Sequence, residues 1–218
     1  MVQPGFFKDL RADYNPFAML RMICISLFCL VSFRPRESHL PAPPVWVVES
    51  GSMLNIEGSS NVNHFTCHMR QYLQGDTLRS VRDDRAKKLW FRNSAVNIDV
   101  MQFDCHQKFI TSDLRKTLKA NKYPYLRIHF LSIDDLTWVQ EGQLVRGQVN
   151  IELAGVVKRF DMEYLVIHEQ GNRFRLRGSR QMHFSDFNLE PPSKLAGLIR
   201  IDQHIKVNFE LLFRVTGS

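Results

Sequence analysis

One stretch of the sequence decides the fold: Val149-Asn150-Ile151-Glu152-Leu153-Ala154-Gly155-Val156-Val157-Lys158-Arg159-Phe160-Asp161-Met162-Glu163-Tyr164-Leu165-Val166. Apolar side chains occupy every second position in the runs on both sides of Gly155. A period of two is typical of a β-strand that has one apolar face and one polar face. Because a glycine separates the two runs, the stretch predicts an antiparallel hairpin.

The same alternation returns elsewhere and predicts a mainly β protein with one helix. Ile110, Leu114 and Leu118 are four residues apart and predict that helix, which ends near 120–121, before Pro124, and is capped by Thr111, Ser112 or Asp113. Loops are expected at residues 75–87 and 185–199. Strands are expected at 45–49 and 52–58 (one strand, broken at Gly51), 65–73, 89–91, 95–103, 126–130, 143–154, 156–169, 173–184 and 204–215.

This set of strands, joined by short connections, predicts a closed antiparallel barrel of about eight strands. Its apolar faces must then point inward. The interior of such a barrel is just wide enough for packed side chains or for one small apolar ligand, and the alternation leaves both outcomes open. The predicted inward set is Val96, Ile98, Val100, Leu126, Ile128, Phe130, Val149, Ile151, Leu153, Phe160, Met162, Tyr164, Phe174, Leu176, Val207, Phe209 and Leu211.

The N-terminal part differs in composition from this barrel, which we expect over residues 45–218. Residues 1–33 contain a short apolar run after Arg21, typical of the core of a signal peptide, although a short buried helix would show the same run. Residues 34–44 are rich in proline and predict a stiff linker. We therefore expect export to the periplasm or the outside, with the N-terminus cleaved or kept as a membrane tether.

The cysteines agree with an oxidising compartment. Cys24 and Cys29 lie in the predicted signal segment, which leaves Cys67 and Cys105 as an even pair. We expect a disulfide between them, the alternative being two buried free thiols. His68 and His106 each follow one of these cysteines, but this spacing does not suit zinc, so we expect no metal and both histidines facing away from the disulfide.

The charge favours an anionic partner without identifying it. The formal net charge is +7, which suits lipid headgroups or nucleic acid. Arg173, Arg175 and Arg177 share one strand face, whereas the aromatic Phe174 lies on the other face. Single-stranded nucleic acid would need aromatic rings on the basic face. We therefore expect a solvated outer face and no nucleic-acid partner.

One further stretch is Lys122-Tyr123-Pro124-Tyr125-Leu126-Arg127-Ile128-His129-Phe130, which follows the predicted helix with its leucine pattern. This stretch resembles the "KYPxIxF" element of YceI-like domains, and the helix resembles the one before that element. Residues 147–158 resemble the family's "GxLTIxGVTK" hairpin. Residues 184–189 resemble its "xxDFGL" element, with Asn188 in place of glycine, and 186–213 resemble the ending of such domains from Bacteroidetes-like bacteria.

This resemblance implies an exported, lipocalin-like eight-stranded barrel, some relatives of which hold a polyisoprenoid chain in the lumen. The resemblance covers about residues 45–215, and members of the family are typically exported. It implies that the inward set lines a tube for an apolar, lipid-like ligand near a membrane. No cofactor is expected, and whether the chain forms a homodimer stays open.

The sequence holds no recognisable catalytic motif, so we expect a binding protein rather than an enzyme. Two alternatives remain. An enzyme acting on a small apolar substrate would need a buried, shifted titratable group in the barrel, for which Tyr164 and His168 are the inward candidates. A structural or interaction module of the cell envelope would need a large exposed apolar patch on the outer face.

Overall fold

The computed structural model describes residues 44–194 and 198–216. The described residues belong to one compact unit, which carries the fold. The predicted signal segment, 1–33, and all of the predicted linker except Pro44 lie outside the described residues. Within the described ranges, no helix is both long and apolar enough to cross a membrane.

The described residues form a β-barrel with one α-helix and short 3-10 turns. The helix is α2 (Lys108–Thr117), and the turns are η2 (Val100–Gln102), η3 (Leu136–Trp138) and η4 (Phe184–Phe187). The strands are β1 (Val45–Val48), β2 (Met53–Ser60), β3 (His64–Met69), β4 (Thr77–Asp83), β5 (Lys88–Arg92), β6 (Ala95–Asp99), β7 (Phe103–Asp104), β8 (Tyr125–Asp134), β9 (Leu144–Leu153), β10 (Val156–His168), β11 (Arg173–His183), β12 (Ser193–Lys194) and β13 (Ile199–Thr216).

Eight of these strands close a ring. Its order is β1-β4-β5-β8-β9-β10-β11-β13, and β13 pairs with β1 to complete it. All of these pairings are antiparallel. The prediction of an eight-stranded antiparallel barrel with one α-helix is therefore confirmed. Five further strands are attached to this ring: β2 pairs with β13, β3 with β2, β7 with β3, β6 with β8, and β12 with β13.

The hairpin that we predicted around Gly155 forms between β9 and β10. β9 and β10 pair from Val156 opposite Leu153 to Leu165 opposite Leu144. Ala154 and Gly155 make the turn with φ angles of 51° and 83°, as tight two-residue hairpins require. A side chain at Gly155 would lie 2.6 Å from the Tyr123 ring. Glycine is therefore needed here for both its backbone freedom and its lack of a side chain.

Several boundaries differ from the sequence prediction. Residues 77–83, which we expected within a loop, form β4, because Leu78 and Ser80 point inward while charged neighbours cover the outer face. The expected loop 185–199 contains η4 and β12, and the last strand begins at Ile199. The one strand that we predicted with a break at Gly51 forms two strands, β1 and β2, which pair with different parts of β13. Helix α2 is confirmed, but its N-cap is Gln107.

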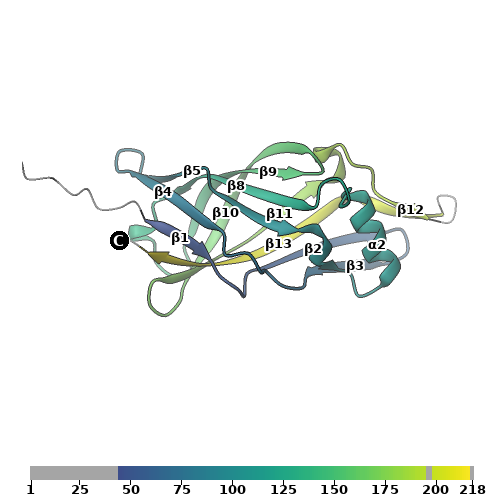
Figure 1. Ribbon diagram of the computed structural model, residues 1–218, viewed down its shortest axis with the longest axis horizontal. Coiled ribbons are helices and arrows are strands. Elements are labelled where there is room, and N and C mark those ends of the chain that lie inside the picture. Colours follow the sequence, from purple (N-terminus) through teal and green to yellow (C-terminus); the bar gives the residue numbers. More distant parts are fainter. Residues whose placement is uncertain (1–43, 195–197, 217–218) are drawn as a thin grey trace, which may run out of the picture. The chain divides into compact units, whose positions relative to one another are not determined.

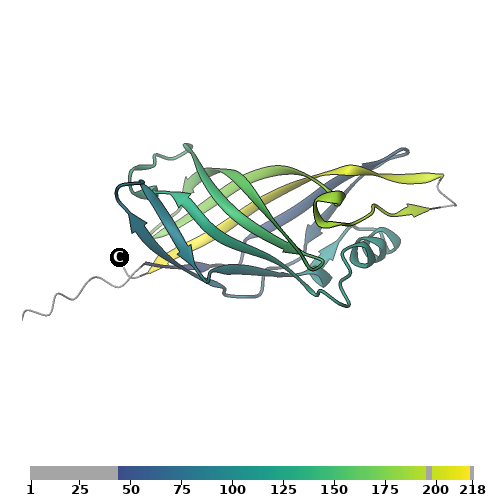
Figure 2. The same cartoon turned by 90° about the horizontal axis from the view of Figure 1, so that it is seen from above.

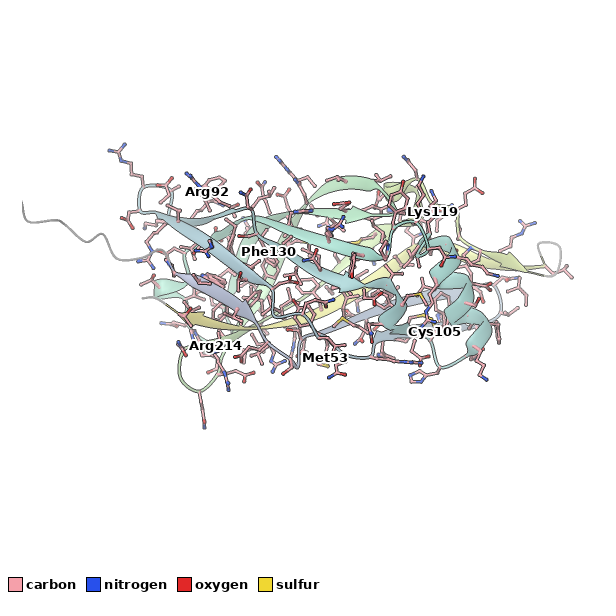
Figure 3. All side chains as sticks on the ribbon, viewed as in Figure 1. Met53, Arg92, Cys105, Lys119, Phe130 and Arg214 are labelled. Carbon is pink, nitrogen blue, oxygen red and sulfur yellow. A yellow bond between two sulfur atoms is a disulfide. The ribbon has the colours of Figure 1, made fainter. Side chains whose placement is uncertain are left out.

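Different secondary-structure elements lie at the two ends of the barrel, and aromatic side chains fill one of these ends. Figures 1 and 2 show α2, β12 and the β2–β3 turn at one end, and the β4–β5 hairpin at the other. At that second end Trp46 packs edge-on against Phe91, Phe174 and Phe213, at ring-centre distances of 4.9–5.7 Å. Phe130 packs on this aromatic cluster from within the barrel (Figure 3). The cluster therefore closes this end with packed rings.

A disulfide joins Cys67 of β3 to Cys105, just before α2 (Figure 3). The predicted bond is confirmed. Both cysteines are buried, and they fix the β2–β3 extension to the segment that leads into the helix. Because Cys105 N–H donates to Thr111 Oγ1 of α2 at 2.9 Å, the disulfide also positions the helix at its end of the barrel.

We predict that the double variant Cys67→Ala/Cys105→Ala loses about 3–4 kcal/mol of unfolding free energy, because the bond closes a loop with a sequence separation of 38. Urea unfolding measures this loss. A reductant should destabilise the wild type to a similar extent and leave the double variant unchanged. Equal stability of wild type and double variant would contradict the structural role of the bond.

Candidate functional site: an apolar barrel cavity

A cavity of about 220 Å³ lies inside the barrel on the α2 side of the aromatic cluster. Its wall is almost entirely apolar and draws on β2, α2, β8, β9, β10 and β13. Eleven residues of the predicted inward set line it: Leu126, Ile128, Phe130, Val149, Ile151, Leu153, Met162, Tyr164, Val207, Phe209 and Leu211. The structure thus brings these residues around one space, and binding of a ligand by them stays a prediction.

The other six members of the inward set are buried but do not line the cavity. Val96, Ile98 and Val100 lie in or directly after β6 and pack into the wall. Phe174 belongs to the aromatic cluster, and Leu176 is buried two residues after it on β11. Phe160 packs against Phe187 of η4 with ring centres 6.0 Å apart. Alternation placed these side chains inside the barrel but could not separate cavity lining from core.

Sequence reasoning missed the elements that complete the cavity wall. Helix α2 contributes Ile110, Leu114 and Leu118, the apolar stripe that predicted the helix itself. The segment around η4 and the first half of β13 contribute further apolar side chains, of which Phe187, Leu189 and Ile199 come from the residues that we expected to be a loop. These additional residues are Met182, Phe184, Phe187, Leu189, Ile199, Ile201 and Ile205.

The mouth of the cavity lies between the β2–β3 turn and α2. Val62 in that turn and Phe109 at the start of α2 both line the cavity, although they are 63% and 61% exposed. The Asn61 side chain binds the adjoining β12–β13 connection, donating to Leu198 O and accepting from Arg200 N–H. Leu198 is itself 73% exposed. Apolar surface therefore continues from the cavity wall to solvent.

His183 lies at the rim, beside a small network of charges. Its ring contacts that of His204, with centres 4.3 Å apart, and its backbone N–H donates to Asp186 Oδ2 at 2.9 Å. Burial alone would raise the pKa of Asp186, but the Lys158 ammonium and the His183 N–H outweigh burial, so the pKa lies below its ordinary value. The charged form of Asp186 therefore holds η4 against β10.

The two titratable candidates from the sequence have different environments. Tyr164 is buried and lines the cavity, and burial raises the pKa of its hydroxyl. His168, expected to point inward, is exposed instead, and its Nε2 donates to Val139 O at 3.2 Å. It stands at the end of β10, where the alternation no longer decides which side faces the barrel.

The basic stripe on β11 is paired with acidic side chains. Arg173 contacts Glu49, Arg175 contacts Glu169, and Arg177 contacts Glu210, at 2.9, 2.8 and 2.7 Å. Opposite charges at these distances neutralise the stripe, which agrees with the expectation of a solvated outer face.

The two histidines beside the disulfide meet each other. The rings of His68 and His106 are 5.2 Å apart at their centres, and His68 Nδ1 donates to Asn55 Oδ1 at 2.8 Å. The contact between the two rings was not expected, and their direction relative to the disulfide stays a prediction. Among residues 44–194 and 198–216, no group of three or more His, Cys, Asp or Glu side chains is arranged to hold a metal ion.

Solved structures share this barrel. BcnA from Burkholderia cenocepacia matches with a TM-score of 0.55 and 13% identity, over 74% of this chain and 96% of BcnA. A polyisoprenoid-binding domain from Saccharophagus degradans, implicated in plant cell wall breakdown, matches with a TM-score of 0.57 and 15% identity, over 78% and 98%. No family profile and no curated protein sequence matches the chain.

At such low identity these matches show the fold alone. The lipocalin-like barrel that the resemblance to YceI-like domains implied is thereby confirmed. The form of the family from Bacteroidetes-like bacteria stays a prediction.

We predict that Asp186→Asn lowers the unfolding free energy by about 1 kcal/mol at pH 7, as expected for loss of a charged partner to a backbone N–H at a turn. The folded-state pKa lies below the ordinary 3.8, so the carboxylate stabilises the protein above that pH, and this contribution disappears as the pH falls through the folded-state pKa. Thermal unfolding of both proteins at pH 7 and pH 3 tests this. A stability gap that does not narrow in acid would contradict it.

Proposed function

We propose that this protein is an exported, non-enzymatic binding protein for an apolar, lipid-like ligand, with a polyisoprenoid chain as the ligand class. The observation that carries the proposal is the cavity itself, which is apolar, closed by aromatic rings at one end and continuous with exposed apolar side chains at the other. The similarity in fold to a polyisoprenoid-binding domain supports the ligand class.

The size of the cavity limits what can enter it without rearrangement. At about 220 Å³ it exceeds the roughly 150 Å³ cavity known to accept benzene, and it is smaller than most pockets for drug-sized ligands. It therefore accepts a short apolar group, while the rest of a longer chain extends through the mouth or displaces flexible side chains. Met162 and Met182 in the wall are suited to such movement.

The energetics favour chain-like hydrocarbons. Each buried methylene group contributes about 0.8 kcal/mol, so a ligand needs few polar contacts to bind tightly. The described polar side chains of the cavity wall are few and gather at the mouth, apart from Tyr164. This distribution suits an amphipathic molecule whose polar part stays near solvent.

The disulfide supports export, because such bonds persist in oxidising compartments. The predicted signal segment points to the same conclusion, and we place the protein in the periplasm or outside the cell, near a membrane. The exposed apolar side chains at the mouth support contact with a lipid surface, through which a ligand could enter without crossing water.

An enzyme on a small apolar substrate is the weaker candidate. Tyr164 is the one titratable side chain of the described cavity wall that lies away from the mouth. Its raised pKa keeps it protonated, and no base stands within hydrogen-bond reach of it in the described ranges. Acid–base chemistry would need such a partner.

We predict that Val207→Trp weakens binding of the uncharged dye N-phenyl-1-naphthylamine by at least about tenfold, because the indole occupies the space that the dye requires. Val157→Trp is the matched control, since Val157 is 58% exposed and outside the cavity. Fluorescence titration measures both affinities. Equal binding by the two variants would place the dye on the surface and contradict the proposal.

Native mass spectrometry of protein purified from its own host provides the direct test of the ligand class. We expect a bound lipid-like species in the wild type and its loss in Val207→Trp. A wild type that carries no lipid and binds no hydrophobic dye would overturn the proposed function.

We also predict that Phe109→Asp reduces binding to vesicles of phosphatidylcholine and phosphatidylglycerol by about tenfold, because an exposed aromatic ring at the mouth is replaced by a charge. Leu144→Asp is the control: Leu144 is also 61% exposed but lies away from the mouth. Vesicle flotation measures the bound fraction. Equal loss in both variants would assign the effect to charge alone.

A further inference from the structure

Tyr164 presents a buried hydroxyl group without a partner at the closed end of the cavity. The residue is 2% exposed, and its ring packs edge-on against Phe209 with centres 5.6 Å apart. Across the part of the chain that the structure describes, its hydroxyl makes no hydrogen bond, and burial is the only cause of its raised pKa. A hydroxyl group in an apolar interior normally has a hydrogen-bond partner. Among the described residues, the fully buried and unpaired side-chain atoms are Ser80 Oγ and Arg115 Nε, so the Tyr164 oxygen, which is not one of them, remains accessible to a partner.

Tyr72 shows what a satisfied buried tyrosine looks like in the same protein. It is 3% exposed, and its hydroxyl donates to Asp76 Oδ2 at 2.7 Å. Asp76 in turn accepts from the backbone and side chain of Asn97. The chain therefore provides a polar network for one buried tyrosine and surrounds the other with apolar groups.

The place of Tyr164 along the cavity matters. It is the last residue of β10, counted from the mouth, to line the cavity, because Val166 beyond it is packed in the core. The ring that packs against Tyr164, Phe209, is apolar and also lines the cavity. The other hydroxyl, amide or charged side chains of the described wall are Ser60, Asn63, Asp113, Thr117 and His183, which all lie toward the mouth.

Two glycines leave room for the Tyr164 ring and for the Phe209 ring beside it. A Cβ atom at Gly147 would lie 3.0 Å from Cε2 of Tyr164 and 2.7 Å from Ser132 O. A Cβ atom at Gly178 would lie 2.5 Å from Cζ of Phe209, the ring that packs on Tyr164. Both strands thus leave out a side chain where these rings lie.

We propose that the Tyr164 hydroxyl donates a hydrogen bond to an uncharged oxygen atom, a carbonyl or an ether, on the part of the ligand that reaches the closed end of the cavity. This inference rests on the proposed function and deepens it, because it adds one uncharged oxygen atom to the inner end of the apolar ligand and leaves the strongly polar part of the ligand near the mouth. A charged group is excluded there, since no counter-charge faces that end within the described wall. The raised pKa keeps the phenol protonated and able to donate.

Two probes that differ only at one carbonyl test the proposal: butyrophenone and butylbenzene. Their dissociation constants are measured by displacement of N-phenyl-1-naphthylamine from wild type, Tyr164→Phe and Tyr72→Phe. In the wild type we expect a preference for butyrophenone that falls about threefold to tenfold in Tyr164→Phe, the range for one hydrogen bond. The Tyr72→Phe variant should keep the wild-type preference.

Thermal unfolding gives an independent measurement. The Tm of Tyr164→Phe should equal or exceed that of the wild type, because the variant removes an unpaired polar group. Tyr72→Phe should lower the Tm, because it removes the hydrogen bond that Asp76 Oδ2 accepts from the phenol. A loss of Tm in Tyr164→Phe as large as that in Tyr72→Phe would show a structural role for the hydroxyl and overturn the inference.

The binding measurements distinguish a failure of the hydrogen bond proposed for Tyr164 from a failure of the proposed function. If both probes bind but their preference is the same in wild type and Tyr164→Phe, the cavity binds apolar ligands and the role of the hydroxyl is wrong. If neither probe nor the dye binds the wild type, the proposed function fails and the inference fails with it.

Discussion

The pairing of β1 with β13 is the constraint on which the rest of the structure depends. β1 is only four residues long, yet it bonds to β4 on one side and β13 on the other and so turns an open sheet into a ring. Closure removes the free sheet edges and directs the apolar face of each strand to one axis. β13 makes this possible by its length, since its later residues hold β1 while its middle residues hold β2. Without closure, the apolar side chains that we predicted to point inward would not surround one shared interior.

Closure of the barrel does not by itself produce a cavity. Aromatic side chains fill one end of the barrel interior, and the cavity lies in the part that they leave empty. Trp46 on β1 lies at the centre of the rings that fill one end. At the other end the wall consists of aliphatic side chains and an α-helix, whose stripe of Ile110, Leu114 and Leu118 cannot reach across the barrel to fill it. The disulfide fixes that helix where it borders the mouth. The same closed sheet therefore has a packed end and an open end.

Period-two alternation was sufficient to predict the barrel and the inward faces of β8 to β11 and β13, because each of those strands has one continuous apolar side. It missed β4, where buried Ser80 interrupts that side and Arg79 and Arg82 resemble a solvated loop. It could not separate Phe174 from Phe209, which have the same pattern, because only the crossing of distant strands places one in the aromatic cluster and the other in the cavity wall. The mouth was beyond prediction because it depends on Asn61 meeting Leu198, 137 residues away.

Asn188 is a position where this sequence departs from the motif of YceI-like domains but keeps the backbone conformation that the motif implies. The family's motif has glycine at this position, and the structure gives Asn188 a φ of 52°, in the left-handed region that glycine and asparagine both tolerate. The departure therefore preserves the backbone that ends η4 and leaves Phe187 and Leu189 in the cavity wall. Tyr164 is different in kind, because no backbone requirement explains its hydroxyl, whereas phenylalanine would pack equally well beside Phe209. Packing in the fold accounts for the aromatic ring of Tyr164, whereas a polar partner inside the cavity accounts for its hydroxyl oxygen.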